Sequence, residues 1–181
     1  MGRSVLFLKI LGAIVVAVTF QGLVPRFWEA FNYVDLPLIL TVYFGLMRDP
    51  LVGMVAGCLA GLAGDLAPGA GGIIGVGGFS KTVIGFFIAM TSIRIPLEGP
   101  FTRILVLALS SLANSLLYIG LHALLDQDAT AGLSVGEVAR RVGFQTAANL
   151  IAGVFIFWLS DKIFPENAPQ GQMRVQRRFY D

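Results

Sequence analysis

Apolar residues along this chain gather in six runs, separated by short segments that contain proline, glycine or charged residues. A helix needs roughly 20 apolar residues to cross about 30 Å of hydrocarbon. The first, fifth and sixth runs meet that length easily, whereas the second to fourth are shorter and rich in glycine, so five spans is the alternative to six. The pattern predicts membrane helices at Val5–Val24, Phe31–Met47, Leu51–Ala67, Phe79–Ile93, Phe101–Leu125 and Phe144–Phe164.

The composition supports this pattern, because apolar residues make up 56% of the 181 residues and charged residues 13%. Soluble domains carry about 25% charged residues, so this chain has too few to cover the surface of a soluble core. We therefore expect an all-α integral membrane protein. A single transmembrane helical domain is predicted over residues 1–165, followed by a short basic cytoplasmic tail at residues 166–181.

The basic residues predict an orientation, because cytoplasmic segments of membrane proteins are enriched in lysine and arginine. With the N-terminus inside, nine of the thirteen basic residues fall on the cytoplasmic side and four on the outer side. Both termini are therefore expected in the cytoplasm. The net charge of +2 is small and the basic residues form no extended patch, so nothing points to nucleic acid.

Small residues line one face of the third predicted helix. Gly53, Gly57 and Gly61 are spaced by four residues, and Gly64 lies on the neighbouring ridge. Such a face lets a second helix backbone approach closely in lipid. Packing inside the same bundle is the favoured interpretation, and contact with a separate membrane partner is the alternative. Ala13 and Ala17 on the first helix show a weaker version of the same spacing.

Three charged residues are predicted at the outer level of the bundle: Asp35, Asp65 and Lys81. Ionisable residues within a membrane are functional candidates because an unpaired charge there is costly. The favoured interpretation is structural: Asp35 caps the second helix, and Asp65 pairs with Lys81 or lies among lipid headgroups. The alternative is a polar pocket or docking site that opens outward. Within the spans, Asn114, Gln145 and Asn149 are expected to hydrogen-bond between the fifth and sixth helices.

Signatures of catalysis or of a bound cofactor are weak. The chain has one histidine, His122, and one cysteine, Cys58, whereas a metal site needs several such ligands at fixed spacing. The glycines before Lys81 superficially resemble a phosphate-binding loop, but Ser80 stands where that motif requires glycine. We therefore expect no enzyme, no metal and no cofactor.

The second and third predicted helices carry a combination of residues that resembles a bacterial family. An aspartate leads the second helix, a basic turn follows at Arg48, and a glycine-rich third helix ends in Gly–Leu–x–x–Asp. This order resembles the rod shape-determining protein MreD over about Val34–Gly85, although the hairpin is unusually glycine-rich here. The matching residues are Val34–Pro37, Tyr43–Leu46, Arg48, Gly53, Gly57 and Gly61–Leu66.

The resemblance implies a six-helix bundle like the substrate-binding S-components of energy-coupling-factor transporters. It also implies a non-enzymatic role in cell-wall elongation at the bacterial inner membrane. MreD-like proteins act with MreC, alongside MreB, RodA and a penicillin-binding transpeptidase. On this interpretation the glycine face and the outer aspartates support docking to a partner helix or to the base of MreC.

A substrate-binding component of a small-molecule or vitamin uptake transporter is the alternative, because it would share the fold. Such a protein needs an outer pocket lined by aromatic and polar groups. Trp28, Phe31, Tyr33 and the outer charges offer material for one.

Overall fold

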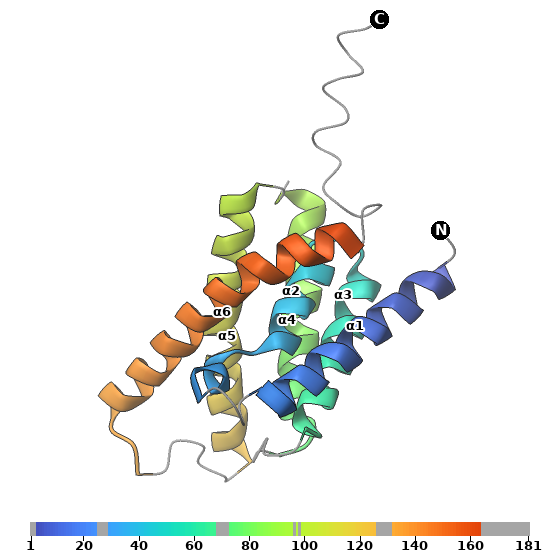
Figure 1. Ribbon diagram of the computed structural model, residues 1–181. Coiled ribbons are helices and arrows are strands. Elements are labelled where there is room, and N and C mark those ends of the chain that lie inside the picture. The colour runs from blue at the N-terminus through green and yellow to red at the C-terminus, as the bar shows by residue number, and fades with distance from the viewer. Residues whose placement is uncertain are drawn as a thin grey trace, which may run out of the picture.

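The computed structural model describes residues 3–24, 29–67, 73–95, 97, 99–125 and 132–163 of the chain. These residues form α-helices and one short 3₁₀ helix, and no strand occurs among them (Figure 1). The expected all-helical fold is confirmed. The α-helices are α1 (Arg3–Leu23), α2 (Leu36–Gly45), α3 (Pro50–Asp65), α4 (Val76–Arg94), α5 (Pro100–Leu124) and α6 (Val135–Ile163), with the 3₁₀ helix at Glu29–Tyr33.

Two helices differ from the hydropathy pattern in length. The second run begins as the 3₁₀ helix, and α2 has only 10 residues because Asp35 caps a new helix start. The sixth helix begins at Val135 rather than Phe144, so its first turns are polar. Ser134 precedes this start, and its backbone N–H and hydroxyl both bind the Glu137 carboxylate at 2.8 Å, as in a capping box. The predicted tail and Trp28 lie outside the described residues.

The short helix α2 lies at the centre of the bundle. All ten of its residues are buried, and it packs against each of the other five α-helices. The most extensive helix–helix contact in the molecule is that between α3 and α4. In Figure 1, α6 crosses the bundle obliquely and α1 covers one side of it.

Four helices are long and apolar enough to cross a membrane: Val5–Leu23 within α1, and the whole of α4, α5 and α6. The apolar helices α2 and α3 are shorter, with 10 and 16 residues. At 1.5 Å per residue, α2 is about 15 Å long, roughly half of the hydrocarbon thickness. The described chain is therefore a helical membrane protein whose two shorter helices are packed against longer ones.

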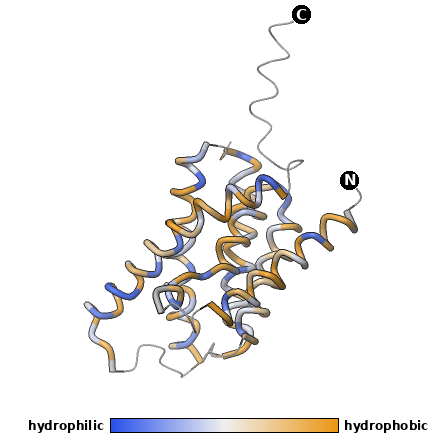
Figure 2. Tube along the Cα trace, viewed as in Figure 1, coloured by the Kyte–Doolittle hydropathy of each residue, from blue (hydrophilic) through white to orange (hydrophobic). Residues whose placement is uncertain are grey.

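The surface and interior are arranged as lipid requires. Large apolar side chains are exposed along the longer helices, including Leu8, Phe101, Leu116 and Ile151 at 70%, 78%, 71% and 78%. Polar groups such as Lys81 are instead buried inside. Figure 2 shows apolar residues along the length of every helix, with polar positions between them, most visibly in the first turns of α6. Polar residues of membrane helices face the bundle interior because lipid offers them no hydrogen bonds.

Candidate functional site

Asp35 marks the start of α2 and the centre of the polar site. Its carboxylate accepts a hydrogen bond from the backbone N–H of Leu38 at 2.9 Å, and Pro37 lies in the first turn. Aspartate before the first turn satisfies N–H groups that have no helical partner, and proline there loses no bond. The Asp35 backbone N–H donates to Asn149 Oδ1 on α6 at 2.7 Å. The predicted helix cap is therefore confirmed.

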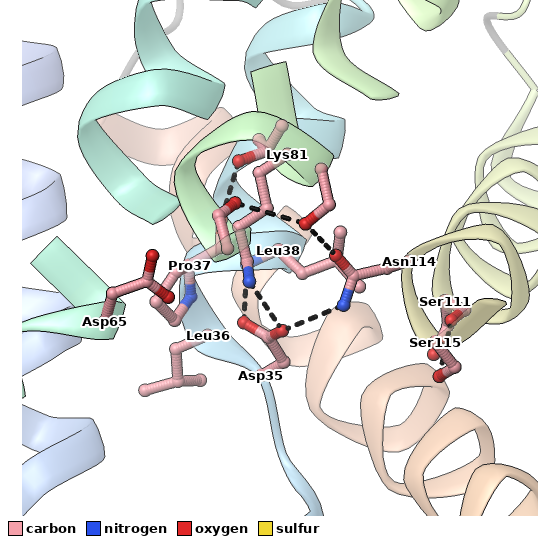
Figure 3. A network of polar contacts seen from close by, with 12 residues as sticks. Asp35, Leu36, Pro37, Leu38, Asp65, Lys81, Ser111, Asn114 and Ser115 are labelled. Carbon is pink, nitrogen blue, oxygen red and sulfur yellow. Dashed lines mark hydrogen bonds and ion pairs between the residues drawn. The ribbon is translucent and has the colours of Figure 1, made fainter. Parts of the chain in front are cut away.

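Lys81 of α4 forms an ion pair with Asp35, with 3.0 Å between Nζ and Oδ2. The two side chains are 9% and 17% exposed, so both charges lie largely inside the protein. The expected pairing of Lys81 with Asp65 is wrong. Figure 3 shows Lys81 directed at Asp35, with Asp65 standing apart from this pair.

Asp65 instead binds the start of α4 from the end of α3. Its Oδ2 accepts hydrogen bonds from the backbone N–H groups of Gly75 at 2.8 Å and Gly78 at 3.2 Å. The cap residue Gly75 has no side chain that could do this, and its φ of 103° suits glycine. A carboxylate at a helix N-terminus also interacts favourably with the helix dipole. A phosphate-binding loop would offer such backbone N–H groups to a ligand, and here Asp65 accepts their hydrogen bonds instead.

Asn114 connects α5 to this charged pair. Its Oδ1 accepts from the Ser80 hydroxyl of α4 at 3.1 Å, and its Nδ2 donates to Asp35 Oδ2 at 3.5 Å (Figure 3). Asn114 is buried, and Ser80 is fully buried. We expected Asn114 to bond with the sixth helix. That expectation is wrong, because Asn114 bonds to Asp35 at the start of α2 and to Ser80 of α4.

Further amides bring α6 and α1 to the same network. Asn149, which is fully buried, donates through Nδ2 to the Ser111 hydroxyl of α5 at 2.9 Å, which confirms the expected bond between these helices. Gln21 of α1 accepts from the Leu36 N–H at 2.9 Å and donates to the Val34 carbonyl. Five helices thus meet through hydrogen bonds around the start of α2.

The glycine face of α3 packs against α4. A Cβ at Gly53 would lie 2.5 Å from the Gly85 carbonyl oxygen, and Cβ atoms at Gly57 and Gly61 would overlap the carbonyls of Lys81 and Gly77. The expected packing inside the bundle is therefore confirmed for these three glycines. They have no room for a separate partner helix.

The other small residues have different surroundings. A Cβ at Gly64 would lie 3.6 Å from Pro37 of α2, an ordinary contact, so Gly64 does not belong to the α3–α4 interface. Ala13 and Ala17 are partly buried and pack against the apolar core. Contact of these alanines with a partner is therefore restricted to their exposed fraction.

A second charged pair lies where α5 begins and α6 ends. Arg103 Nη1 donates to Asp161 Oδ2 at 2.8 Å, with side chains 12% and 34% exposed. This pair was not predicted from the sequence. The two residues are 58 positions apart, and no local pattern links them.

The described residues contain no group of three or more histidine, cysteine, aspartate or glutamate side chains able to hold a metal ion. His122 is buried, with Nδ1 at 2.9 Å from the Tyr118 carbonyl oxygen and Nε2 at 3.5 Å from the Ile73 N–H. This geometry suits the neutral ring with its proton on Nδ1. The arrangement holds backbone in place, and it presents no nucleophile beside a base.

No protein-family model, curated protein or solved structure matches this chain. The family expectation therefore rests on the residues from Val34 to Gly85 and on their spacing. Most of these residues fall on α2, α3 and α4.

Proposed function

We propose that this chain is a non-enzymatic membrane component of the bacterial cell-wall elongation machinery. It would maintain rod shape by binding MreC and helping to organise peptidoglycan synthesis. One observation carries this proposal: several residues in the stretch that resembles the MreD family make the polar and packing contacts inside the bundle. Asp35 caps α2 and pairs with Lys81, Gly57 packs on α4, and Asp65 caps α4.

The polar residues of the site bond to other parts of the same chain, and this favours a scaffold over a substrate-binding transporter component. A binding pocket needs polar groups that are free to receive a ligand. Here Asp35, Lys81, Asp65 and Asn114 all bond to other parts of the same chain. A rigid bundle held from within is well suited to presenting fixed surfaces to partner proteins.

We further propose that the chain lies in the bacterial inner membrane with six crossings and both termini in the cytoplasm. The nine-to-four distribution of basic residues supports this orientation. A single cysteine placed in the loop between α5 and α6 should react with an impermeant maleimide added to spheroplasts, in a Cys58→Ser background. Reaction of a cysteine at position 174 under the same conditions would contradict the orientation.

MreC is the proposed direct partner, with MreB, RodA and a penicillin-binding transpeptidase in the same assembly. Because α4 covers the glycine face of α3, a partner would use a surface other than that face. The exposed faces of α1, α5 and α6 remain available in the described part of the chain. The outer aspartates would then act by holding these faces in place.

Co-purification tests the proposed partner. The tagged chain, expressed with the MreC protein of its own organism and solubilised in mild detergent, should retain MreC through affinity and size-exclusion steps. An unrelated single-span protein at the same abundance serves as the control. Recovery of MreC no greater than that of the control would contradict the proposal.

A further inference from the structure

The last turns of α6 carry an apolar and aromatic stripe on the surface of the bundle. Ile151, Phe155 and Trp158 are spaced by four and three residues, which places them on one face of the helix. They are 78%, 62% and 54% exposed, and the Phe155 and Trp158 ring centroids are 6.0 Å apart. In a membrane protein such a face contacts lipid chains.

Lys162 continues this stripe at the end of α6. Its Nζ lies 4.0 Å from the centroid of the Trp158 ring, within the range of a cation–π interaction. No carboxylate among the described residues forms a salt bridge with Lys162, and the adjacent Asp161 is held by Arg103. A lysine ammonium has three N–H donors, so donors remain for a further acceptor while the ring covers one side.

The position of Lys162 and Trp158 near the end of α6 indicates which acceptor would bind the Lys162 ammonium group. Tryptophan is enriched where hydrocarbon meets headgroups, and Lys162 lies one residue before α6 ends at Ile163. Basic side chains at this level attract anionic phospholipids. We propose that this face of α6 binds one anionic phospholipid, with its phosphate on Lys162 beside Trp158 and an acyl chain along Phe155 and Ile151.

Two features favour an anionic lipid over other occupants. A zwitterionic lipid would gain from a carboxylate near its ammonium group, but Asp161 is already bound to Arg103. An acidic protein segment would match Lys162 but not the apolar stripe below it, whereas a lipid offers a phosphate and a chain in one molecule. The site is separate from the network around Asp35 and does not depend on the proposed role in wall elongation.

Lipid retention by the purified full-length chain tests this proposal. In native mass spectrometry, the wild type should retain phosphatidylglycerol in preference to phosphatidylcholine of the same chains. Lys162→Gln should weaken that retention about fivefold, as expected for one basic side chain at an anionic surface. Trp158→Leu should weaken this retention as well, because Lys162 loses its cation–π contact with the Trp158 ring. Inorganic phosphate should not displace the lipid.

The control is Arg140→Gln, which removes the same charge from an exposed position near the other end of α6. It should leave retention unchanged, with size-exclusion elution confirming that each variant is folded. Equal retention of the two lipids by the wild type would overturn the proposal. So would an equal loss in Arg140→Gln, which would indicate a net-charge effect, or displacement by phosphate, which would indicate a simple anion site.

Discussion

Replacing Gly57 by leucine is expected to destabilise the bundle strongly, as the same change at Gly61 should, because a Cβ at either position would overlap the backbone of α4. A Cβ at Gly57 would overlap the carbonyl oxygen and carbon of Lys81, and backbone cannot move aside as a flexible side chain can. Overpacking a well-packed interior costs about 1–3 kcal/mol, and we expect at least the upper value here. Gly57→Ala should also be destabilising, since the overlap begins at Cβ. Thermal unfolding in detergent, followed by tryptophan fluorescence, measures the effect.

Matched controls come from two other helical glycines. Gly12 on α1 and Gly120 on α5 have no atom within 4 Å of a built Cβ. Gly12→Leu and Gly120→Leu should therefore unfold within a few degrees of the wild type. If Gly57→Leu unfolds at the same temperature as these controls, then α3 and α4 do not pack through glycine.

Breaking the Lys81–Asp35 pair is expected to have the second large effect. Lys81→Met leaves the Asp35 carboxylate largely buried without its counter-charge. Removing one member of a buried pair costs about 3–5 kcal/mol, and we expect the lower end because the Asp35 side chain is 17% exposed. Asp35→Asn removes the negative charge but keeps the helix cap, since asparagine still caps a helix well. Unfolding temperature and yield of monodisperse protein are the measurements.

The double variant Asp35→Asn with Lys81→Met separates the ion pair from other effects. With both charges gone, no unpaired charge remains, so the combined loss of stability should be well below the sum of the two single losses. Additive losses would show that the two residues act independently. Asp65→Asn combined with Lys81→Met should be close to additive, because Asp65 binds Gly75 and Gly78 instead.

Helix starts were predictable where a run of apolar residues marks them, and less predictable where polar residues form the first turns. The starts of α3 and α5 at Pro50 and Pro100 lie within one residue of the predicted ones, because each helix begins with a proline that is followed by an apolar run. The start of α6 was missed by nine residues, since its first turns are polar and their cap at Ser134 carries no apolar signal.

The glycine face and the Asp35 cap were predictable because both depend on local spacing. The charge pairing was not predictable, because Asp65 is 16 residues from Lys81 and Asp35 is 46 residues away. Proximity in sequence favoured Asp65, whereas packing of α4 on α3 leaves Asp65 at the backbone of α4. Ser80 and Ser111 were missed because serine is common in membrane helices whether or not it bonds across them.

Cell width after complementation tests the central claim most directly. In a rod-shaped bacterium depleted of its own MreD, expression of this chain together with its cognate MreC should maintain rods of normal width. Gly57→Leu should fail, and Gly120→Leu should succeed at equal membrane abundance. Cells that stay round with the wild-type chain present at normal levels and MreC co-expressed would contradict a role in rod shape.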